Sequence, residues 1–114
     1  MSNRYVISQL DEQPTIECSC GVTRRAFLQD VDQVASVHFL KVTSKARRHY
    51  HKQLTEIYII IEGSGYLELD EDQVSVKPNM AVMVKPGCRH RAVGNMTILN
   101  IVVPAFNPED EWFE

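Results

Sequence analysis

Long apolar segments are missing from this sequence. The longest apolar run, Ile57 to Ile61, is far shorter than the roughly 20 residues that a membrane-spanning helix requires. The N-terminus, from Met1 to Tyr5, also lacks the apolar stretch of a secretory signal peptide. We therefore expect a cytoplasmic protein with no membrane partner.

Cysteine is scarce as well, with three residues in the chain. An odd number leaves at least one thiol unpaired, and Cys18 and Cys20 stand too close together in the sequence for an easy disulfide. We therefore expect reduced thiols. Positive charge is not in excess either, because the formal net charge is −3, which disfavours general nucleic-acid binding.

The composition is that of a globular protein. Hydrophobic residues make up 44% of the chain and charged residues 24%, a balance that argues against disorder. The 114 residues suit one domain, 1–114, since no linker, repeat or low-complexity tract divides them.

Charge is distributed unevenly along the chain. Five basic residues and no acidic ones lie between Lys41 and Lys52, whereas four of the last six residues are acidic. The simplest interpretation of both runs is solvated surface. The basic run has a second interpretation, in which it attracts an anionic ligand toward a nearby pocket.

Turn residues divide most of the chain into short segments rich in β-branched and apolar residues. Short strands at this spacing are typical of an all-β sandwich or barrel. The Glu62–Gly65 segment predicts a tight turn between two of them, and no segment shows a helical stripe with caps. The expected strands cover 34–42, 56–61, 66–69, 73–76, 80–84, 88–93 and 96–103, with weaker candidates at 5–7 and 23–28.

Three of the four histidines and one glutamate lie near one another in this arrangement of strands. Alternate side chains of a strand point to the same face, so His49 and His51 would share one space. Glu56 begins the next strand after a short turn, and His90 follows the Pro86-Gly87 turn. We expect an antiparallel barrel to bring these four side chains together.

Three neutral imidazoles and one carboxylate suit one divalent transition metal ion: Mn, Fe, Ni, Co, Cu or Zn. Ligand types alone do not choose among these metals. An octahedral ion held by four protein groups keeps two positions for water, substrate or dioxygen, which permits Lewis-acid or redox chemistry. A His-x-His pair alone is a weak signal, because such pairs often face solvent, but Glu56 and the two turns strengthen it.

Two stretches resemble the motifs of small single-domain cupins. His49, His51, Glu56 and Gly63 are similar to the first motif, at about 43–63, and Pro86-Gly87 with His90 is similar to the second, at about 79–95. The resemblance implies a double-stranded β-helix, or jelly-roll, barrel that holds a metal inside with His49, His51, Glu56 and His90. Thr43 and Asn79 stand where the motifs usually open with glycine, and asparagine tolerates a left-handed backbone.

Other side chains near the expected site have two interpretations each. Tyr58 shares strand parity with Glu56, and Arg47 shares it with His49, so both are weak candidates for catalytic or ligand-binding residues. A core tyrosine and a surface arginine are the alternatives. His38 and Cys88 are better interpreted as packed strand residues than as ligands.

Our first hypothesis is a metal-dependent enzyme that acts on a small molecule, anionic if the basic run attracts it, either in dioxygenation or in isomerisation or epimerisation of a sugar or sugar phosphate. The alternative is a non-catalytic module that binds a small ligand, with a structural or anchoring metal. The aromatic pair Trp112-Phe113 must either fold back on the barrel or pack on a second subunit. Small cupins are commonly dimers, so we expect a homodimer.

Overall fold

The structure is a computed structural model that describes residues 4–44 and 46–113. Within these residues, nearly all regular structure is strand. The strands are β1 (Ile16–Cys18), β2 (Gly21–Ala26), β3 (Ser36–Val42), β4 (His49–Tyr50), β5 (Thr55–Leu69), β6 (Asp72–Val76), β7 (Ala81–Val84), β8 (His90–Val103) and β9 (Trp112–Phe113). The two short 3-10 helices are η1 (Leu10–Glu12) and η2 (Pro108–Asp110). No helix in this part of the chain is long and apolar enough to cross a membrane.

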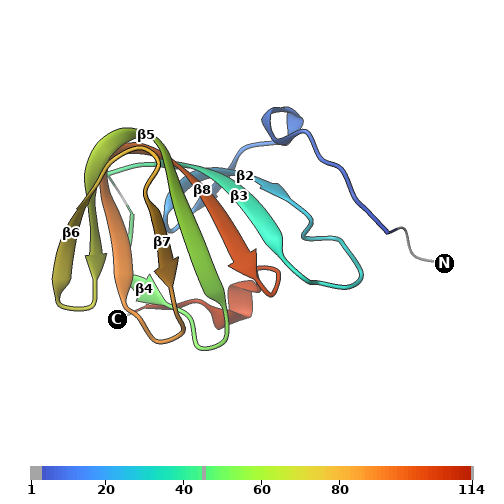
Figure 1. Cartoon of the computed structure of the whole chain (residues 1–114). Coiled ribbons are helices and arrows are strands. Elements are labelled where there is room, and N and C mark those ends of the chain that lie inside the picture. The colour runs from blue at the N-terminus through green and yellow to red at the C-terminus, as the bar shows by residue number, and fades with distance from the viewer. Residues whose placement is uncertain (1–3, 45, 114) are drawn as a thin grey trace.

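The longest strands, β5 and β8, form the spine of one curled antiparallel sheet. β8 pairs with β5 on one side and with β3 on the other, and β2 and β1 continue the sheet beyond β3. β6 and β7 both pair with β5, one with each half of it. The sheet curls into the open barrel seen in Figure 1, which confirms the all-β jelly-roll barrel expected from the sequence.

The predicted turn at Glu62–Gly65 is wrong. β5 runs through these residues without interruption, with a register shift between Ile60 and Glu62. Gly63 has φ +91°, and a Cβ there would lie 2.0 Å from the carbonyl oxygen of Asn95. Glycine is therefore needed for a bend and a close strand crossing inside one long strand, not for a turn between two strands.

The apolar core lies between the main strands of the barrel. Leu40, Ile60, Leu67 and Ile98 are among its fully or almost fully buried members. They lie on β3, β5 and β8, so these three strands are fixed against one another by apolar burial, worth about 1.5–3 kcal/mol per large side chain. The same packing fixes the strands that carry the polar cluster described below.

The weaker N-terminal strand candidates had mixed outcomes. Residues 5–7 form no strand, and Tyr5 and Ile7 are 74% and 84% exposed. The second candidate, 23–28, corresponds to β2, which extends from Gly21 to Ala26.

The prediction of reduced thiols at Cys18 and Cys20 is contradicted by a disulfide between them. The turn between β1 and β2 brings their Cα atoms to 5.3 Å, within the range that a disulfide needs. The cytoplasmic location loses that support and stays a prediction. Cys88 is a free, partly buried thiol that packs against the core.

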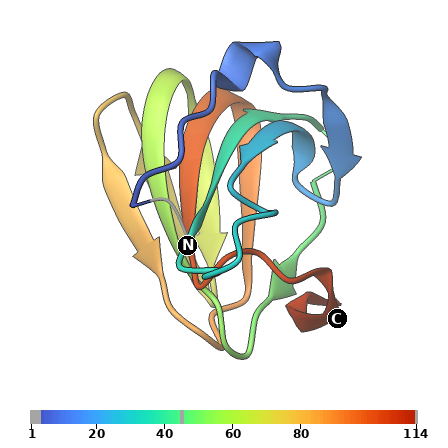
Figure 2. The same cartoon turned by 90° about the vertical axis from the view of Figure 1, so that its right-hand side faces the viewer.

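The acidic C-terminal run is not simply solvated surface. Asp110 is 7% exposed, and its carboxylate accepts hydrogen bonds from the backbone amides of Lys52, Gln53 and Leu54. Figure 2 shows the segment lying beside β4, where β9 pairs with β4. Glu114 of this run, like Lys45 of the basic run, lies outside the described residues.

Candidate metal centre

Strand pairing brings the four predicted ligands together. His49 opens β4 and pairs directly with His90, the first residue of β8, while Glu56 is the second residue of β5 and His51 follows β4. One potential ligand atom from each residue lies within 4.8 Å of those of the others, and all four side chains are buried. These residues could hold a metal ion.

Backbone carbonyls fix the orientation of all three imidazole rings. The Nδ1 of His49 donates to the carbonyl of Arg47 at 2.8 Å, and that of His90 donates to the carbonyl of Cys88 at 2.8 Å. The Nδ1 of His51 donates to the carbonyl of Asp110 at 2.7 Å. Because each Nδ1 carries the proton, each neutral ring presents the lone pair of its Nε2. Histidines that bind metals are oriented in this way.

The short distances between Glu56 and two of the imidazole rings require a positive charge in the cluster. Its Oε1 lies 2.9 Å from Nε2 of His90 and 3.1 Å from Nε2 of His51, and the latter contact lacks hydrogen-bond geometry. A lone pair on Nε2 and a carboxylate oxygen are both acceptors and repel each other at these distances. Either a proton or a metal cation between them must offset this repulsion. The donor set, three nitrogens and one carboxylate oxygen, fits a divalent transition metal.

The electrostatics of the cluster agree with that requirement. Burial alone would raise the pKa of Glu56, but the close imidazoles of His51 and His90 hold it well below its usual value. Burial lowers the pKa of His49, and the neighbouring His90 adds to this effect. Burial also opposes protonation of His51, but Glu56 outweighs it and raises the pKa of that ring. The carboxylate is thus ionised in a site that water hardly reaches.

Asn100 is a functional candidate that the sequence reasoning missed. It lies on β8, is 7% exposed, and its Nδ2 donates to Oε2 of Glu56 at 2.6 Å. This hydrogen bond fixes the second carboxylate oxygen and leaves Oε1 toward the histidines. The signal was present in the sequence, since Asn100 interrupts the apolar strand segment between Leu99 and Ile101.

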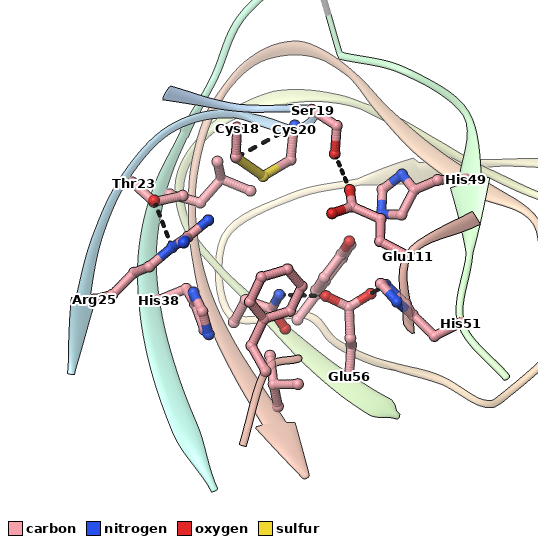
Figure 3. A pocket seen from close by; sticks show the side chains of 15 residues that line it. Cys18, Ser19, Cys20, Thr23, Arg25, His38, His49, His51, Glu56 and Glu111 are labelled. Atoms are coloured by element: carbon pink, nitrogen blue, oxygen red, sulfur yellow. Dashed lines mark hydrogen bonds and ion pairs between the residues drawn. A yellow bond between two sulfur atoms is a disulfide. The ribbon is translucent and has the colours of Figure 1, made fainter. Parts of the chain in front are cut away.

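Three of the four residues, His49, His51 and Glu56, line one side of a cavity of about 30 Å³, which holds roughly two water molecules. Figure 3 shows Arg25 and His38, on the neighbouring strands β2 and β3, at the opposite side, whereas Glu111 reaches in from the C-terminal segment beside His49. The Oγ of Ser19 donates a hydrogen bond to Glu111. The Cys18–Cys20 disulfide completes this wall.

His38 is buried, as expected for a packed histidine. Its Nε2 lies 2.8 Å from the Oγ of Ser36. Burial, assisted by the charge of Arg25, lowers the pKa of His38 to about 4, so the ring is neutral near pH 7. It also lines the cavity, a position that the sequence did not indicate.

The two weak candidates have different positions. Tyr58 is buried and lines the cavity, and burial, together with the charge of Glu56, raises the pKa of its hydroxyl well above 10. Arg47 is exposed and lies over the ring of Phe113, with its guanidinium carbon 3.9 Å from the ring centroid. None of the described lysines and arginines between Lys41 and Lys52 lines the cavity.

A curled antiparallel barrel with a buried three-histidine, one-glutamate cluster defines an all-β barrel protein with a candidate metal centre on its inner face. The chain belongs to the cupin domain family, whose model matches residues 36–102. The uncharacterized protein MJ1618 of Methanocaldococcus jannaschii is 32% identical over 84 residues, which cover 70% of this chain and 67% of that protein.

Solved structures agree with this assignment. A protein from Planctomyces limnophilus is 38% identical, with a TM-score of 0.90 over 96% of each chain. The nucleoside dehydratase Pac13 from Streptomyces has a TM-score of 0.79 at 20% identity, over 96% of this chain and 94% of that one. At that identity, the likeness shows the fold alone.

Proposed function

We propose that this cupin is a metal-dependent enzyme that acts on a small anionic molecule, with one divalent transition metal ion held by His49, His51, Glu56 and His90. The observation that carries the proposal is the arrangement of three Nε2 lone pairs around an ionised, buried carboxylate. When bound, the metal would act as a Lewis acid that polarises a carbonyl or hydroxyl oxygen.

The protein groups around the cavity favour proton transfer over oxygen chemistry. Glu111 places a carboxylate in the cavity, and Tyr58 contributes a hydroxyl that stays protonated near pH 7. A carboxylate that removes a proton beside an activated carbonyl, and a hydroxyl that donates one, are the groups that isomerisation or dehydration needs. Of the two reaction types expected from the sequence, isomerisation is therefore preferred to dioxygenation.

The non-catalytic binding module is the competing function. It requires the same metal ligands, but in it Glu111 and Tyr58 transfer no protons. A small substrate that carries an exchangeable C–H bond beside a carbonyl distinguishes the two functions. In deuterated water, an enzyme exchanges that hydrogen for deuterium, whereas a binding module holds the molecule unchanged.

The metal site is tested first, by elemental analysis after loading with each candidate metal. We expect one ion per chain in the wild type and a loss of most of it in His49→Ala and His90→Ala. His38→Gln is the matched control, because His38 lines the same cavity outside the cluster, and it should keep the ion. Retention of full stoichiometry in His90→Ala would disprove the site.

The reaction is tested on the metal-loaded chain with a panel of small 2-oxo and 2-hydroxy acids. Proton NMR in deuterated water should show loss of a C–H signal with the wild type, and slower loss with Glu111→Gln. Binding without exchange across the panel and all candidate metals would instead support the binding module.

The homodimer also belongs to the proposal. Trp112 and Phe113 fold back on the barrel through β9, yet each remains 40% exposed. Tyr5, Ile7 and Val31 add further exposed apolar surface in the N-terminal part of the chain. Contact between two copies would cover such surface. Light scattering at micromolar concentration should give twice the chain mass of 13.1 kDa, and a monodisperse monomer would refute the dimer.

A further inference from the structure

Arg25 is the one lysine or arginine that lines the metal-site cavity among the described residues. It lies on β2, where its backbone pairs with His38 on β3. Figure 3 shows its guanidinium directed into the cavity from the wall opposite His49 and His51. The basic run that suggested an anionic ligand in the sequence lies elsewhere, and Arg25 was not among the sequence candidates.

Two contacts hold the Arg25 side chain in place. Its Nε donates to Oγ1 of Thr23 at 3.1 Å, and its guanidinium carbon lies 5.1 Å from the ring centroid of Phe106. Neither terminal nitrogen has a hydrogen-bond acceptor among the described residues. A half-buried guanidinium with its Nε anchored and both terminal nitrogens available is a suitable partner for the two oxygens of a carboxylate.

Phe106 connects this side of the cavity with the metal centre. The same ring that lies beneath Arg25 has its centroid 6.5 Å from that of His51. An occupant that passes over Phe106 would therefore meet a cation at one end and the predicted metal ligands at the other.

The charges around the cavity indicate an occupant with one negative charge. In the proposed function, the two negative charges of Glu56 and Glu111 balance the two positive charges of the divalent ion. His38 is neutral and adds no charge. The cavity as a whole then keeps one positive charge, and among the described residues the only carboxylate that acts on Arg25 through its charge is Glu111, which this count already includes. Desolvation makes such a charge costly unless a ligand pairs with it.

We propose that Arg25 binds a carboxylate of the substrate, so that the enzyme acts on small carboxylic acids whose other end reaches the metal centre. The proposal rests on the proposed function, because it places the second end of the molecule at the metal. The cavity, about 30 Å³, holds only about two water molecules as it stands, so even a short acid enters only when Glu111 moves aside.

The test compares diacids with their monoamides on the metal-loaded chain. Malonate, succinate and glutarate each offer one carboxylate to the metal and one to Arg25, and the monoamides replace the second with a neutral group. By isothermal titration calorimetry, we expect Arg25→Gln to weaken the best diacid tenfold or more and its monoamide less than about threefold. Arg25→Lys should retain part of the diacid affinity, since a lysine keeps the positive charge but lacks the two parallel N–H donors of a guanidinium.

Arg24→Gln is the matched control. Arg24 is the neighbouring residue of β2, and its side chain donates instead to the backbone carbonyls of Asp11 and Gln13, away from the cavity. It should leave diacid affinity unchanged. A second readout is the NMR signal of the Arg25 Nε–H group, which should shift when the diacid binds and shift less with the monoamide.

The outcomes separate this proposal from the metal site. If wild type and Arg25→Gln bind every diacid equally, or if no diacid binds to the metal-loaded wild type, the carboxylate proposal is wrong while the metal stoichiometry stands. Equal weakening of a diacid and its monoamide would also overturn it, because Arg25 would then act on cavity shape. If metal stoichiometry survives His90→Ala, it is the proposed function that fails.

Discussion

Replacement of Asp110 by alanine should damage both the fold and the metal site. The carboxylate accepts hydrogen bonds from the amides of Lys52 and Gln53 at 2.9 Å and of Leu54 at 3.0 Å. Burial alone would raise its pKa, but these three amides and the indole Nε1–H of Trp112, which donates at 3.2 Å, hold it below the ordinary value, so it is ionised near neutral pH. The backbone carbonyl of the same residue orients His51.

The expected loss can be worked out from these contacts. A hydrogen bond to a charged group contributes about 1.5–3 kcal/mol. Lys52, Gln53 and Trp112 are exposed, so water can partly replace three of the four bonds, and the total should be about 2–4 kcal/mol. For a domain of this size, that corresponds to a fall of roughly 10 °C in Tm. Alanine keeps the backbone carbonyl that orients His51, but without the carboxylate η2 is no longer fixed against the turn after β4, so that carbonyl loses its position. A ring that has lost its hydrogen-bonded orientation typically binds metal about 10- to 100-fold more weakly.

Thermal unfolding of the metal-free chain, followed by circular dichroism, isolates the effect on stability. Competition with a chelator then measures metal affinity. Glu109→Ala is the control, because Glu109 is the exposed neighbour in η2 and its side chain makes no hydrogen bond among the described residues. A variant Asp110→Ala that melts within about 2 °C of the wild type, with unchanged metal affinity, would refute the reasoning.

Two further predictions concern the backbone and the pH response. Gly63→Ala should lower the free energy of unfolding in urea by about 3 kcal/mol or more, because its Cβ would meet the Asn95 carbonyl. The control is Gly87→Ala, at φ +90° in open space, which should lower it by about 1 kcal/mol. Equal losses of stability in the two variants would disprove the steric argument. Burial, with the charge of Arg25, lowers the pKa of His38 from 6.5 to about 4, so below pH 6.5 the unfolded chain binds a proton that the folded chain does not. Stability should therefore fall as the pH drops from 6.5 to 4, by up to about 3 kcal/mol from this residue. His38→Gln should show a shallower decline in urea midpoints between pH 7 and pH 4.5, and an unchanged slope would exclude His38 as the cause.

The predicted metal ligands were accessible to sequence reasoning because they depend on local rules. His49 and His51 are two residues apart in an extended segment, so they face one space. The Pro86-Gly87 turn sets the start of β8, and therefore the place of His90. The positive φ of Asn79, +74°, agrees with the expectation that asparagine can replace glycine at that turn.

Other features depend on contacts that a periodic pattern does not contain. Gly63 looked like a turn residue because a bend within a long strand needs the same backbone freedom as a turn. Asp110 and Glu111 looked like surface because acidic residues near a chain end are usually solvated. Their roles come from the docking of η2 and β9 against the turn after β4, a contact between residues more than 50 positions apart.

The division of the cavity between two parts of the chain explains why family membership does not identify the substrate. All four predicted metal ligands lie within residues 36–102, the region that the cupin model matches. Arg25, Phe106 and Glu111 line the same cavity but lie outside that region, on β2 and in the C-terminal segment. Under the proposed function, a cupin could therefore keep its metal centre while these other lining residues change, and they rather than the centre would select the molecule that binds. Substitution of Arg25 or Glu111 should then alter which acids bind, while the protein still binds one metal ion per chain.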